Sequence, residues 1–414
     1  MSPAIDAAAS TASERGSAGG VFRAFLRLGL TSFGGPVAHL GYFRTEFVAR
    51  RRWLDETAFA DIVALCQFLP GPASSQTGIA IGLLRAGLPG AFAAWLGFTA
   101  PSALAMILFG YGVTRFGDLS HSGWLHGLKL VAVAVVAQAV WGMARSLCPD
   151  RERATVAVAA ALLALFLPGA TGQVGAIVLG AVIGWVWFRA GEAGPPGAPL
   201  DLALPRGLGI AALSGFFVLL GGLTLLAAAL PAQQPLAVFA SFYRSGALVF
   251  GGGHVVLPLL QAAVVPPGWV SNDLFLAGYG AAQAVPGPLF TFSAYLGTVM
   301  QTPPNGWPGG LLCLMAIFLP SFLLVIGVLP FWDGLRRRRA MRASLRGVNA
   351  AVVGLLAAAL YTPVWTSAVG SSADFALALT AFLLLTAWAT PPWLVVLLGA
   401  VAAALLPPWG AAPA

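Results

Sequence analysis

Two stretches of this chain share one pattern of glycine and polar residues, 217 positions apart. Residues 25–36 read FLRLGLTSFGGP, and residues 242–253 read FYRSGALVFGGG. When 25–40 is aligned with 242–257, 7 of 16 residues are identical, where about one or two would match by chance in so biased a composition. This repetition predicts a chain built from two homologous halves.

A second duplicated motif follows each of these stretches. Residues 67–72 read QFLPGP, and residues 283–288 read QAVPGP. Glycine and proline interrupt helices, so the four motifs mark four breaks at repeat-related positions. Duplicated halves with interrupted apolar segments at matching positions are typical of the binding site of a secondary transporter.

The composition indicates a membrane protein. Of the 414 residues, 58% are hydrophobic and 9% are charged, and the mean hydropathy is +0.86. These values exclude an ordinary soluble globule and predict an all-α polytopic membrane protein. The net charge of +8 comes from arginines in short loops between apolar segments, which the positive-inside rule explains. The expected partner is therefore the lipid bilayer, and no nucleic acid is expected.

Thirteen apolar segments can be marked along the chain, six in each half and one unpaired between them at 207–231. The stretch before the unpaired segment is rich in proline and is expected to be a linker. The predicted organisation is a disordered N-terminal tail at 1–20, an N-terminal transporter half at 21–190, a linker and connecting transmembrane helix at 191–235, and a C-terminal transporter half at 236–414.

The loop charges predict the orientation of the halves. The loop at 44–52 carries four arginines, but its second-half counterpart at 258–273 has no lysine or arginine. Conversely, arginines crowd the loop at 336–346, whose first-half counterpart at 116–124 has none. Opposite charge in equivalent loops predicts two inverted halves. If the helices broken at the four motifs are re-entrant, both arginine-rich loops become cytoplasmic, and the N-terminus is expected there too.

Arg27 and Arg244 occupy equivalent positions inside apolar segments, a few residues before their glycine breaks. One interpretation is an arginine that reaches the membrane interface, which suits Arg27 because Arg23 lies one turn away. The other is function, since charge within the bilayer is costly. A guanidinium offers paired donors that suit an oxyanion, so this interpretation predicts an anionic substrate.

The breaks themselves can also hold an anion. A helix that ends at a break leaves backbone N–H groups free and directs a partial positive charge at the gap. Gln67 and Gln283 precede the two PGP motifs and add neutral donors, although a helix-to-helix hydrogen bond is an equal alternative. His39 and His254 follow the glycine breaks; they are either packed, hydrogen-bonded residues or titrating groups for proton coupling.

No catalytic apparatus is apparent in the sequence. It has no Walker loop and no HExxH or GxSxG motif, and its three cysteines lack metal-ligand spacing. We therefore expect neither an enzyme nor a cofactor or metal. The candidate substrate-binding residues are Arg27, Gly34, Gly35, Pro36, His39, Gln67, Pro70, Gly71, Pro72, Arg244, Gly251, Gly252, Gly253, His254, Gln283, Pro286, Gly287 and Pro288.

The motifs closely resemble those of the chromate ion transporter family. The resemblance rests on FLRLGLTSFGGPVAHLGYFRTEFVARRRW (25–53), LCQFLPGPASSQTGIAIG (65–82), FGGGHVVLPLL (250–260) and AVPGPLFTFSAYLG (284–297). It implies the long-chain, two-domain form, which exports chromate across the bacterial inner membrane. The family's motif residues fall on the glycines and prolines of all four breaks and on Arg27, His39, Gln67 and His254.

Several alternatives stay open at this point. A sulfate or other oxyanion carrier of the same architecture is the nearest rival, because sulfate and chromate share shape and charge. A membrane-embedded chromate reductase is a rival of another class, against which the lack of a flavin, haem or metal motif argues. The membrane potential is the expected driving force; proton exchange at His39 or His254 is an addition that the sequence does not demand. Stoichiometry and a homodimeric state are not determined.

Overall fold

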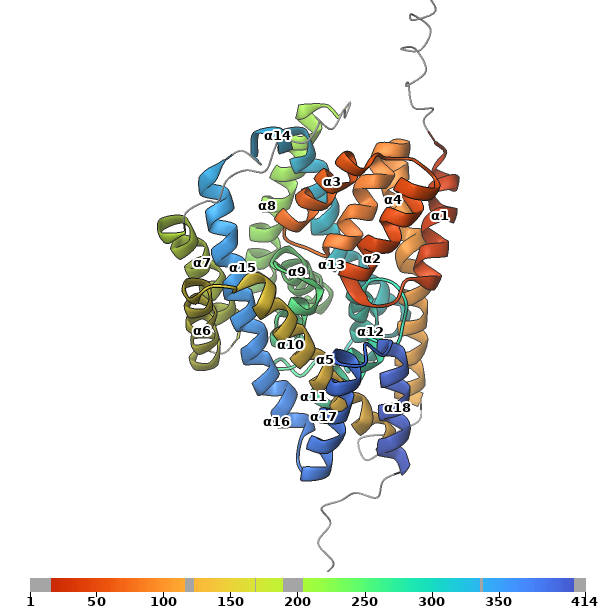
Figure 1. Cartoon of the computed structure of the whole chain (residues 1–414), viewed down its shortest axis with the longest axis vertical. Coiled ribbons are helices and arrows are strands. Elements are labelled where there is room, and N and C mark those ends of the chain that lie inside the picture. Colours follow the sequence, from red (N-terminus) through yellow and green to blue (C-terminus); the bar gives the residue numbers. More distant parts are fainter. Residues whose placement is uncertain (1–15, 116–122, 168, 189–203, 336–337, 406–414) are drawn as a thin grey trace, which may run out of the picture.

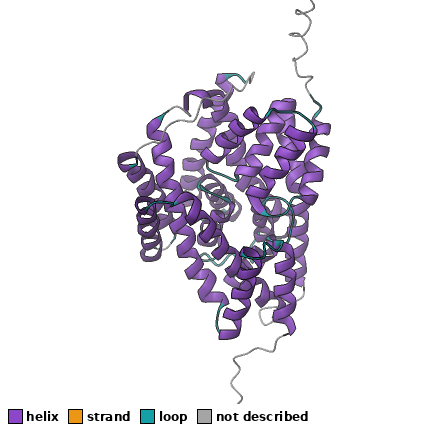
Figure 2. Cartoon of the chain, in the orientation of Figure 1, coloured by secondary structure: helices purple, strands orange, loops and turns teal. Residues whose placement is uncertain are grey.

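The computed structural model describes residues 16–115, 123–167, 169–188, 204–335 and 338–405. Every regular element within these residues is a helix, and they contain no strand (Figures 1 and 2). The predicted all-α class is therefore confirmed. The predicted tail (1–20) and the start of the predicted linker (191–235) lie largely outside the described residues.

The first half begins with short helical elements and continues with longer helices. Two of the helices begin at an aspartate whose carboxylate accepts a backbone N–H: Asp55 from Ala58 and Asp150 from Arg153. The elements are α1 (Ala18–Thr31), α2 (Gly35–Arg44), η1 (Thr45–Arg50), α3 (Glu56–Phe68), α4 (Ala73–Arg115), α5 (Gly123–Leu147), α6 (Arg151–Phe166) and α7 (Ala170–Trp187). Helix α8 (Arg206–Ala229) connects the halves.

Helix α4 is a hairpin of two helical arms. Ala86 and Gly87 have non-helical backbone, and Gly87 has a left-handed φ of 66° that favours glycine. Gly82 and Gly90 lie so close that a Cβ on either would overlap the carbonyl oxygen of the other. The two arms are therefore antiparallel neighbours, packed through small residues as membrane helices often are.

The second half repeats this order of elements. Its regular elements are α9 (Gln234–Ala247), η2 (Gly253–Val255), α10 (Val256–Val264), α11 (Asn272–Ala282), η3 (Leu289–Thr291), α12 (Phe292–Val299), α13 (Gly306–Val328), η4 (Leu329–Phe331), α14 (Trp332–Leu335), α15 (Arg339–Ala359), η5 (Leu360–Trp365), α16 (Thr366–Ala368), α17 (Ser372–Thr386) and α18 (Pro392–Leu405). Helices α9 and α11 end at the predicted breaks, as α1 and α3 do in the first half.

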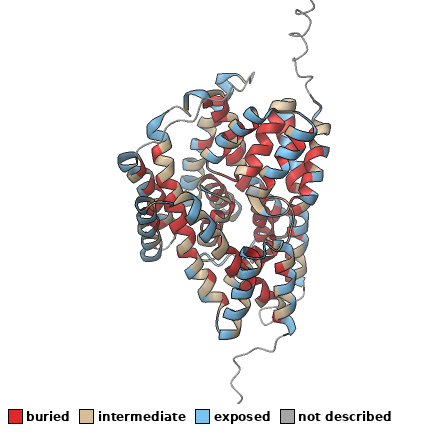
Figure 3. Ribbon diagram, in the orientation of Figure 1, coloured by how far each residue is buried: buried red, intermediate tan, exposed pale blue. Residues whose placement is uncertain are grey.

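The long helices identify a multi-pass membrane protein. Five helical stretches of the described chain are long and apolar enough to span a bilayer: Ala73–Arg115, Gly123–Leu147, Arg206–Ala229, Gly306–Leu335 and Arg339–Ala368. Figure 3 shows exposed residues along the outer helices, and many of the exposed side chains are large and apolar: Trp187 is 79% exposed and Leu225 is 73% exposed. Such a surface suits lipid and not water.

The two halves interlock through their last helices. Helix α5 of the first half packs against α17 and α18 of the second, and α15 of the second half packs against α6 and α7 of the first. The closest approaches are reciprocal: a Cβ on Gly127 would overlap the carbonyl oxygen of Gly399, and one on Gly347 would overlap that of Gly180. Each half is therefore completed by a hairpin from the other.

Candidate functional site

The four breaks meet between the halves. The backbone N–H of Gly71 donates to the carbonyl oxygen of Val249 at 2.7 Å, and that of Gly287 donates to the carbonyl oxygen of Ser32 at 2.9 Å. Gly71 and Gly287 are equivalent in the repeat, and so are Ser32 and Val249. Each PGP break is thus held by the residues just before the glycine break of the opposite half.

Only glycine fits at these two positions, because the backbone has a positive φ and a serine of the other half leaves no room for a Cβ atom. Gly71 has φ 128° and Gly287 has φ 101°, values that side chains rarely tolerate. A Cβ on Gly71 would lie 2.9 Å from Ser321 Oγ, and one on Gly287 would lie 2.8 Å from Ser102 Oγ. The two breaks therefore fit tightly into the facing half.

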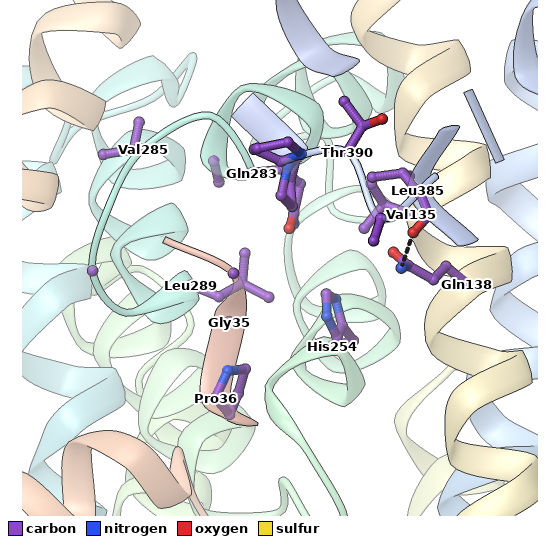
Figure 4. Close-up of a pocket in the computed structure, with 16 residues that line it drawn as sticks. Gly35, Pro36, Val135, Gln138, His254, Gln283, Val285, Leu289, Leu385 and Thr390 are labelled. Atoms are coloured by element: carbon purple, nitrogen blue, oxygen red, sulfur yellow. Dashed lines mark hydrogen bonds between the residues drawn. The ribbon is translucent and has the colours of Figure 1, made fainter. Parts of the chain in front are cut away.

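A cavity of about 290 Å³ opens beside the breaks, with walls from both halves (Figure 4). Its first-half wall contains Gly34–Pro36 and two residues of α5, Val135 and Gln138. Its second-half wall contains His254 and parts of the second PGP break and of the loop between α17 and α18. The lining includes no acidic side chain, no lysine and no arginine.

The structure brings only part of the predicted set to this cavity. Gly34, Gly35, Pro36, His254, Gln283 and Gly287 line it. Gly253 lies directly behind the lining, since a Cβ there would be 3.4 Å from Pro36 Cγ. The predicted residues that do not line the cavity are Arg27, His39, Gln67, Pro70, Gly71, Pro72, Arg244, Gly251, Gly252, Pro286 and Pro288.

The two predicted arginines occupy different surroundings despite their equivalent positions. Arg27 is exposed on the outer face of α1, where Arg23 and Thr31 are exposed as well. Arg244 is half-buried in α9 and lines a narrow slot with Gln173 of α7. Neither guanidinium lines the cavity.

The two predicted histidines also differ. His39 is 1% exposed; its Nδ1 lies 3.4 Å from Ser74 Oγ, and its ring packs edge-on against Phe98. His254 lines the cavity, and its Nδ1 lies 2.7 Å from Tyr279 Oη. Only His254 is therefore in a position to contact a molecule in the cavity.

The donors that face the cavity are neutral. Gln283 lines it, and its Nε2 is buried without a hydrogen-bond partner in the described part of the chain, whereas the equivalent Gln67 is exposed. Helix α2 begins at Gly35 and so directs its N-terminus at the cavity. A helix N-terminus with unpartnered amides favours an anion.

Two polar residues of the cavity were not predicted from the sequence. Gln138 lies in α5 and donates from Nε2 to the carbonyl oxygen of Leu385 at 3.1 Å. Thr390 lies in the loop between α17 and α18. The only sequence signal was that Gln138 is a polar residue within an apolar segment, and Thr390 gave no signal. The position of both residues depends on the packing of α17 and α18 against α5.

A cluster of charged side chains lies just after α2, at the end of this helix that is away from the cavity and outside the apolar spans. Glu46 is 7% exposed and accepts hydrogen bonds from Arg51 Nε at 2.6 Å and from Arg50 at 3.1 Å. Burial raises the pKa of this carboxyl, but the two guanidinium groups outweigh it and hold the pKa below its ordinary value. Glu46 therefore forms ion pairs with both Arg50 and Arg51.

Comparison with known proteins gives a family match over most of the chain. A family model described as "Chromate transporter" matches residues 19–185 and again residues 236–404. The two matched segments correspond to the two halves and leave out the connecting α8. No solved structure matches this chain.

Individual relatives match at moderate identity. A chromate transport protein of Pseudomonas aeruginosa is 29% identical over 348 residues, which cover 82% of this chain and 79% of the relative. A chromate transport protein of Cupriavidus metallidurans is 26% identical over 344 residues, which cover 81% of this chain and 80% of the relative. An uncharacterized transporter of Methanocaldococcus jannaschii is 25% identical over 350 residues, with 83% of each chain covered.

Proposed function

This chain belongs to the chromate transporter family, and from that premise we propose that it is a secondary transporter that exports chromate across the bacterial inner membrane. The observation that carries the proposal is the cavity of about 290 Å³, because breaks from both halves line it. Substrate sites of secondary transporters are commonly built from discontinuous helices at the interface of two repeats.

The substrate fits the chemistry of the cavity. Chromate is a tetrahedral dianion, and the cavity offers the N-terminus of α2 together with neutral donors from Gln283 and His254. Such dipoles can hold an anion without a full positive charge. The absence of an arginine from the lining keeps binding weak enough for release, which a transporter needs as much as binding.

We include Arg27 and Arg244 in the proposal: the anion contacts these two residues outside the cavity, along its transport path. Each lies on the helix directly before a glycine break, α1 for Arg27 and α9 for Arg244. The guanidinium of Arg244 has no hydrogen bond or ion pair with any described residue. An unpaired guanidinium inside an apolar region is costly, which supports a functional role in another state of the transport cycle.

We further propose that the halves are inverted and that the helices at the breaks are re-entrant. Helices of 8–14 residues, such as α12 and α1, are shorter than the roughly 20 residues that a crossing needs. In Figure 1 the second arm of α4 leads toward the lower end, whereas α13 leads upward into α14. Helix α3, the start of α8 and α14 gather at the upper end, beside the arginine-rich segments, which supports a cytoplasmic face and N-terminus there.

The membrane potential is sufficient as the driving force. When two negative charges move outward across an inside-negative potential of about 100 mV, the electrical force favours the movement and about 4.6 kcal/mol is released. By the rule of tenfold per 1.4 kcal/mol, this supports an outward gradient of about 2000-fold. Proton exchange is therefore not required.

Counterflow in proteoliposomes tests the function. The purified chain is reconstituted, and labelled chromate and labelled sulfate are each exchanged against an internal pool of the same anion. The proposal expects chromate counterflow and, in a separate measurement of net efflux, chromate export that an inside-negative potential accelerates. Sulfate counterflow without chromate counterflow would favour the alternative, a sulfate or other oxyanion carrier of the same architecture.

A further inference from the structure

His254 and Tyr279 form an isolated hydrogen-bonded pair beside the cavity. His254 Nδ1 lies 2.7 Å from Tyr279 Oη. The Tyr279 side chain is fully buried in α11, and neither side chain has another hydrogen bond among the described residues. The remaining ring nitrogen, His254 Nε2, belongs to a side chain that lines the cavity (Figure 4).

The direction of this hydrogen bond follows from counting donors and acceptors. If the histidine ring donated from Nδ1, the phenolic proton of Tyr279 would be buried without an acceptor, which costs about 1–3 kcal/mol. If Tyr279 donates, every group is satisfied, and a neutral histidine then carries its proton on Nε2. A doubly protonated ring would also have to donate from Nδ1 and would leave the same phenolic proton without an acceptor.

We propose that Tyr279 is a positioning residue that holds His254 as a neutral Nε2–H donor to an oxygen of the transported oxyanion. The inference rests on the proposed function and specifies how its site works. His254 Nε2–H and the unpartnered Nε2 of Gln283 are two side-chain donors of the second-half wall, which also contains the hydroxyl of Thr390. They give the dianion hydrogen bonds without a proton transfer, because Nδ1 has no free lone pair to protonate.

The described residues that line the cavity beside His254 include no charged group that would change this assignment. The cavity lining has no acidic, lysine or arginine side chain. The elements that pack against η2 include α10, η3 and α15; α10 and η3 carry no titratable residue. The arginines of α15 all precede Gly347, whereas Val352 is the α15 residue near the glycine break. Tyr279 is therefore the titratable group that His254 contacts.

Two readouts test the inference on the full chain in proteoliposomes. The first is the tautomer of His254 from ¹⁵N NMR of histidine-labelled protein, assigned by the signal that His254→Gln removes. We expect Nε2 to be protonated and Nδ1 unprotonated from about pH 6 to about pH 8, the range in which histidine usually titrates. An Nδ1–H tautomer, or a charged ring in this range, would overturn the inference.

The second readout is the KM for chromate in a set of variants. Tyr279→Phe is expected to raise KM about tenfold and to give a mixture of tautomers, because an oxyanion hydrogen bond is worth about that factor. Tyr295→Phe is the matched control: Tyr295 is also fully buried and donates to the carbonyl oxygen of Leu274 at 2.9 Å, but Leu274, unlike His254, does not line the cavity. It should lower stability and leave KM within about twofold of wild type.

A pair of histidine replacements separates positioning from packing. Glutamine places an amide nitrogen near the position of Nε2, whereas asparagine places one near Nδ1. His254→Gln should therefore retain about tenfold more transport than His254→Asn. Equal transport by the two variants would refute His254 as an Nε2–H donor. A Tyr279→Phe KM equal to that of the Tyr295→Phe control would refute Tyr279 as the residue that positions it. If wild-type protein carries no oxyanion at all, the proposed function fails, while the tautomer measurement still decides the histidine assignment.

Discussion

Gly287 donates its backbone N–H to the carbonyl oxygen of Ser32 at 2.9 Å, across the interface between the two halves. The repeat places the same bond, from Gly71 to Val249, on the other side of the interface. A pair of reciprocal bonds between unlike breaks means that neither half can form the central region alone. A displacement of one half against the other would change all four breaks together, which is how a two-state transporter can couple its two faces.

Gly287→Ala is expected to destabilise the protein strongly. The substitution combines a left-handed φ of 101° with a Cβ that would lie 2.8 Å from Ser102 Oγ, and each effect typically costs about 1–3 kcal/mol. Gly268→Ala is the control, because Gly268 has φ 75° and open space around it. Thermal unfolding in detergent should show a clearly larger loss for Gly287→Ala; equal losses would mean that the contact with Ser102 contributes nothing.

Arg27→Ala and Arg244→Ala should each abolish chromate resistance in cells while leaving membrane insertion intact. The physical reason is the loss of a guanidinium that the dianion meets along its path. Arg23→Ala is the control for general surface charge, since Arg23 is exposed one turn before Arg27. Full resistance in both single variants would eliminate a role for these arginines in transport.

Gln283→Leu should raise the KM for chromate about tenfold, because it removes a donor that has no protein partner. Gln67→Leu is the informative comparison, since the repeat makes the two residues equivalent while only Gln283 lines the cavity. The expected effect is larger for Gln283 than for Gln67. Initial rates of chromate uptake in proteoliposomes measure both, and the reverse order would contradict the cavity as the binding site.

Lys129 and Asp273 should be energetically coupled across the halves. Lys129 Nζ lies 2.8 Å from Asp273 Oδ1, with a Lys129 side chain that is only 11% exposed. Because Asp273 is half-exposed, we expect a coupling of about 0.5–1 kcal/mol in a double-mutant cycle with alanine. The more exposed pair of Arg151 and Glu152 should show no measurable coupling. Additive losses at Lys129 and Asp273 would mean that the ion pair does not hold the halves together.

Glu46→Gln should destabilise the protein at neutral pH and have little effect in acid. The pKa of Glu46 is lowered in the folded protein, so its stabilisation is complete above the unfolded value near 4.3 and is lost as the pH falls through the folded value. The difference in Tm between wild type and Glu46→Gln should therefore shrink below about pH 4. Glu56→Gln, which breaks an exposed pair with Arg44, should change Tm less; a constant Glu46 difference at all pH values would contradict the assignment.

The sequence predicted the parts of this molecule that depend on local chemistry. Glycine and proline determine where α1, α3, α9 and α11 end, so the breaks could be read directly from the motifs. The repeat also identified Gln67 and Gln283 as equivalent, but equivalence in sequence does not guarantee equivalent surroundings. One glutamine is exposed and the other lines the cavity.

The parts that were not predicted depend on contacts between distant segments. Gln138 and Thr390 reach the cavity only because α17 and α18 pack against α5 of the other half. The spacing of residues in these segments does not indicate that the last helices of one half pack against the other half. The same long-range packing places Arg27 on an outer face, while its repeat partner Arg244 is half-buried.

Locating the bound anion by cryo-electron microscopy tests the central claim most directly. The full chain in lipid nanodiscs is imaged with and without chromate, and the difference density is compared with the described cavity. We predict density between the N-terminus of α2, His254 Nε2 and Gln283 Nε2, within hydrogen-bond distance of both side chains. Density at the Arg244 slot or elsewhere, with this cavity empty, would contradict the account.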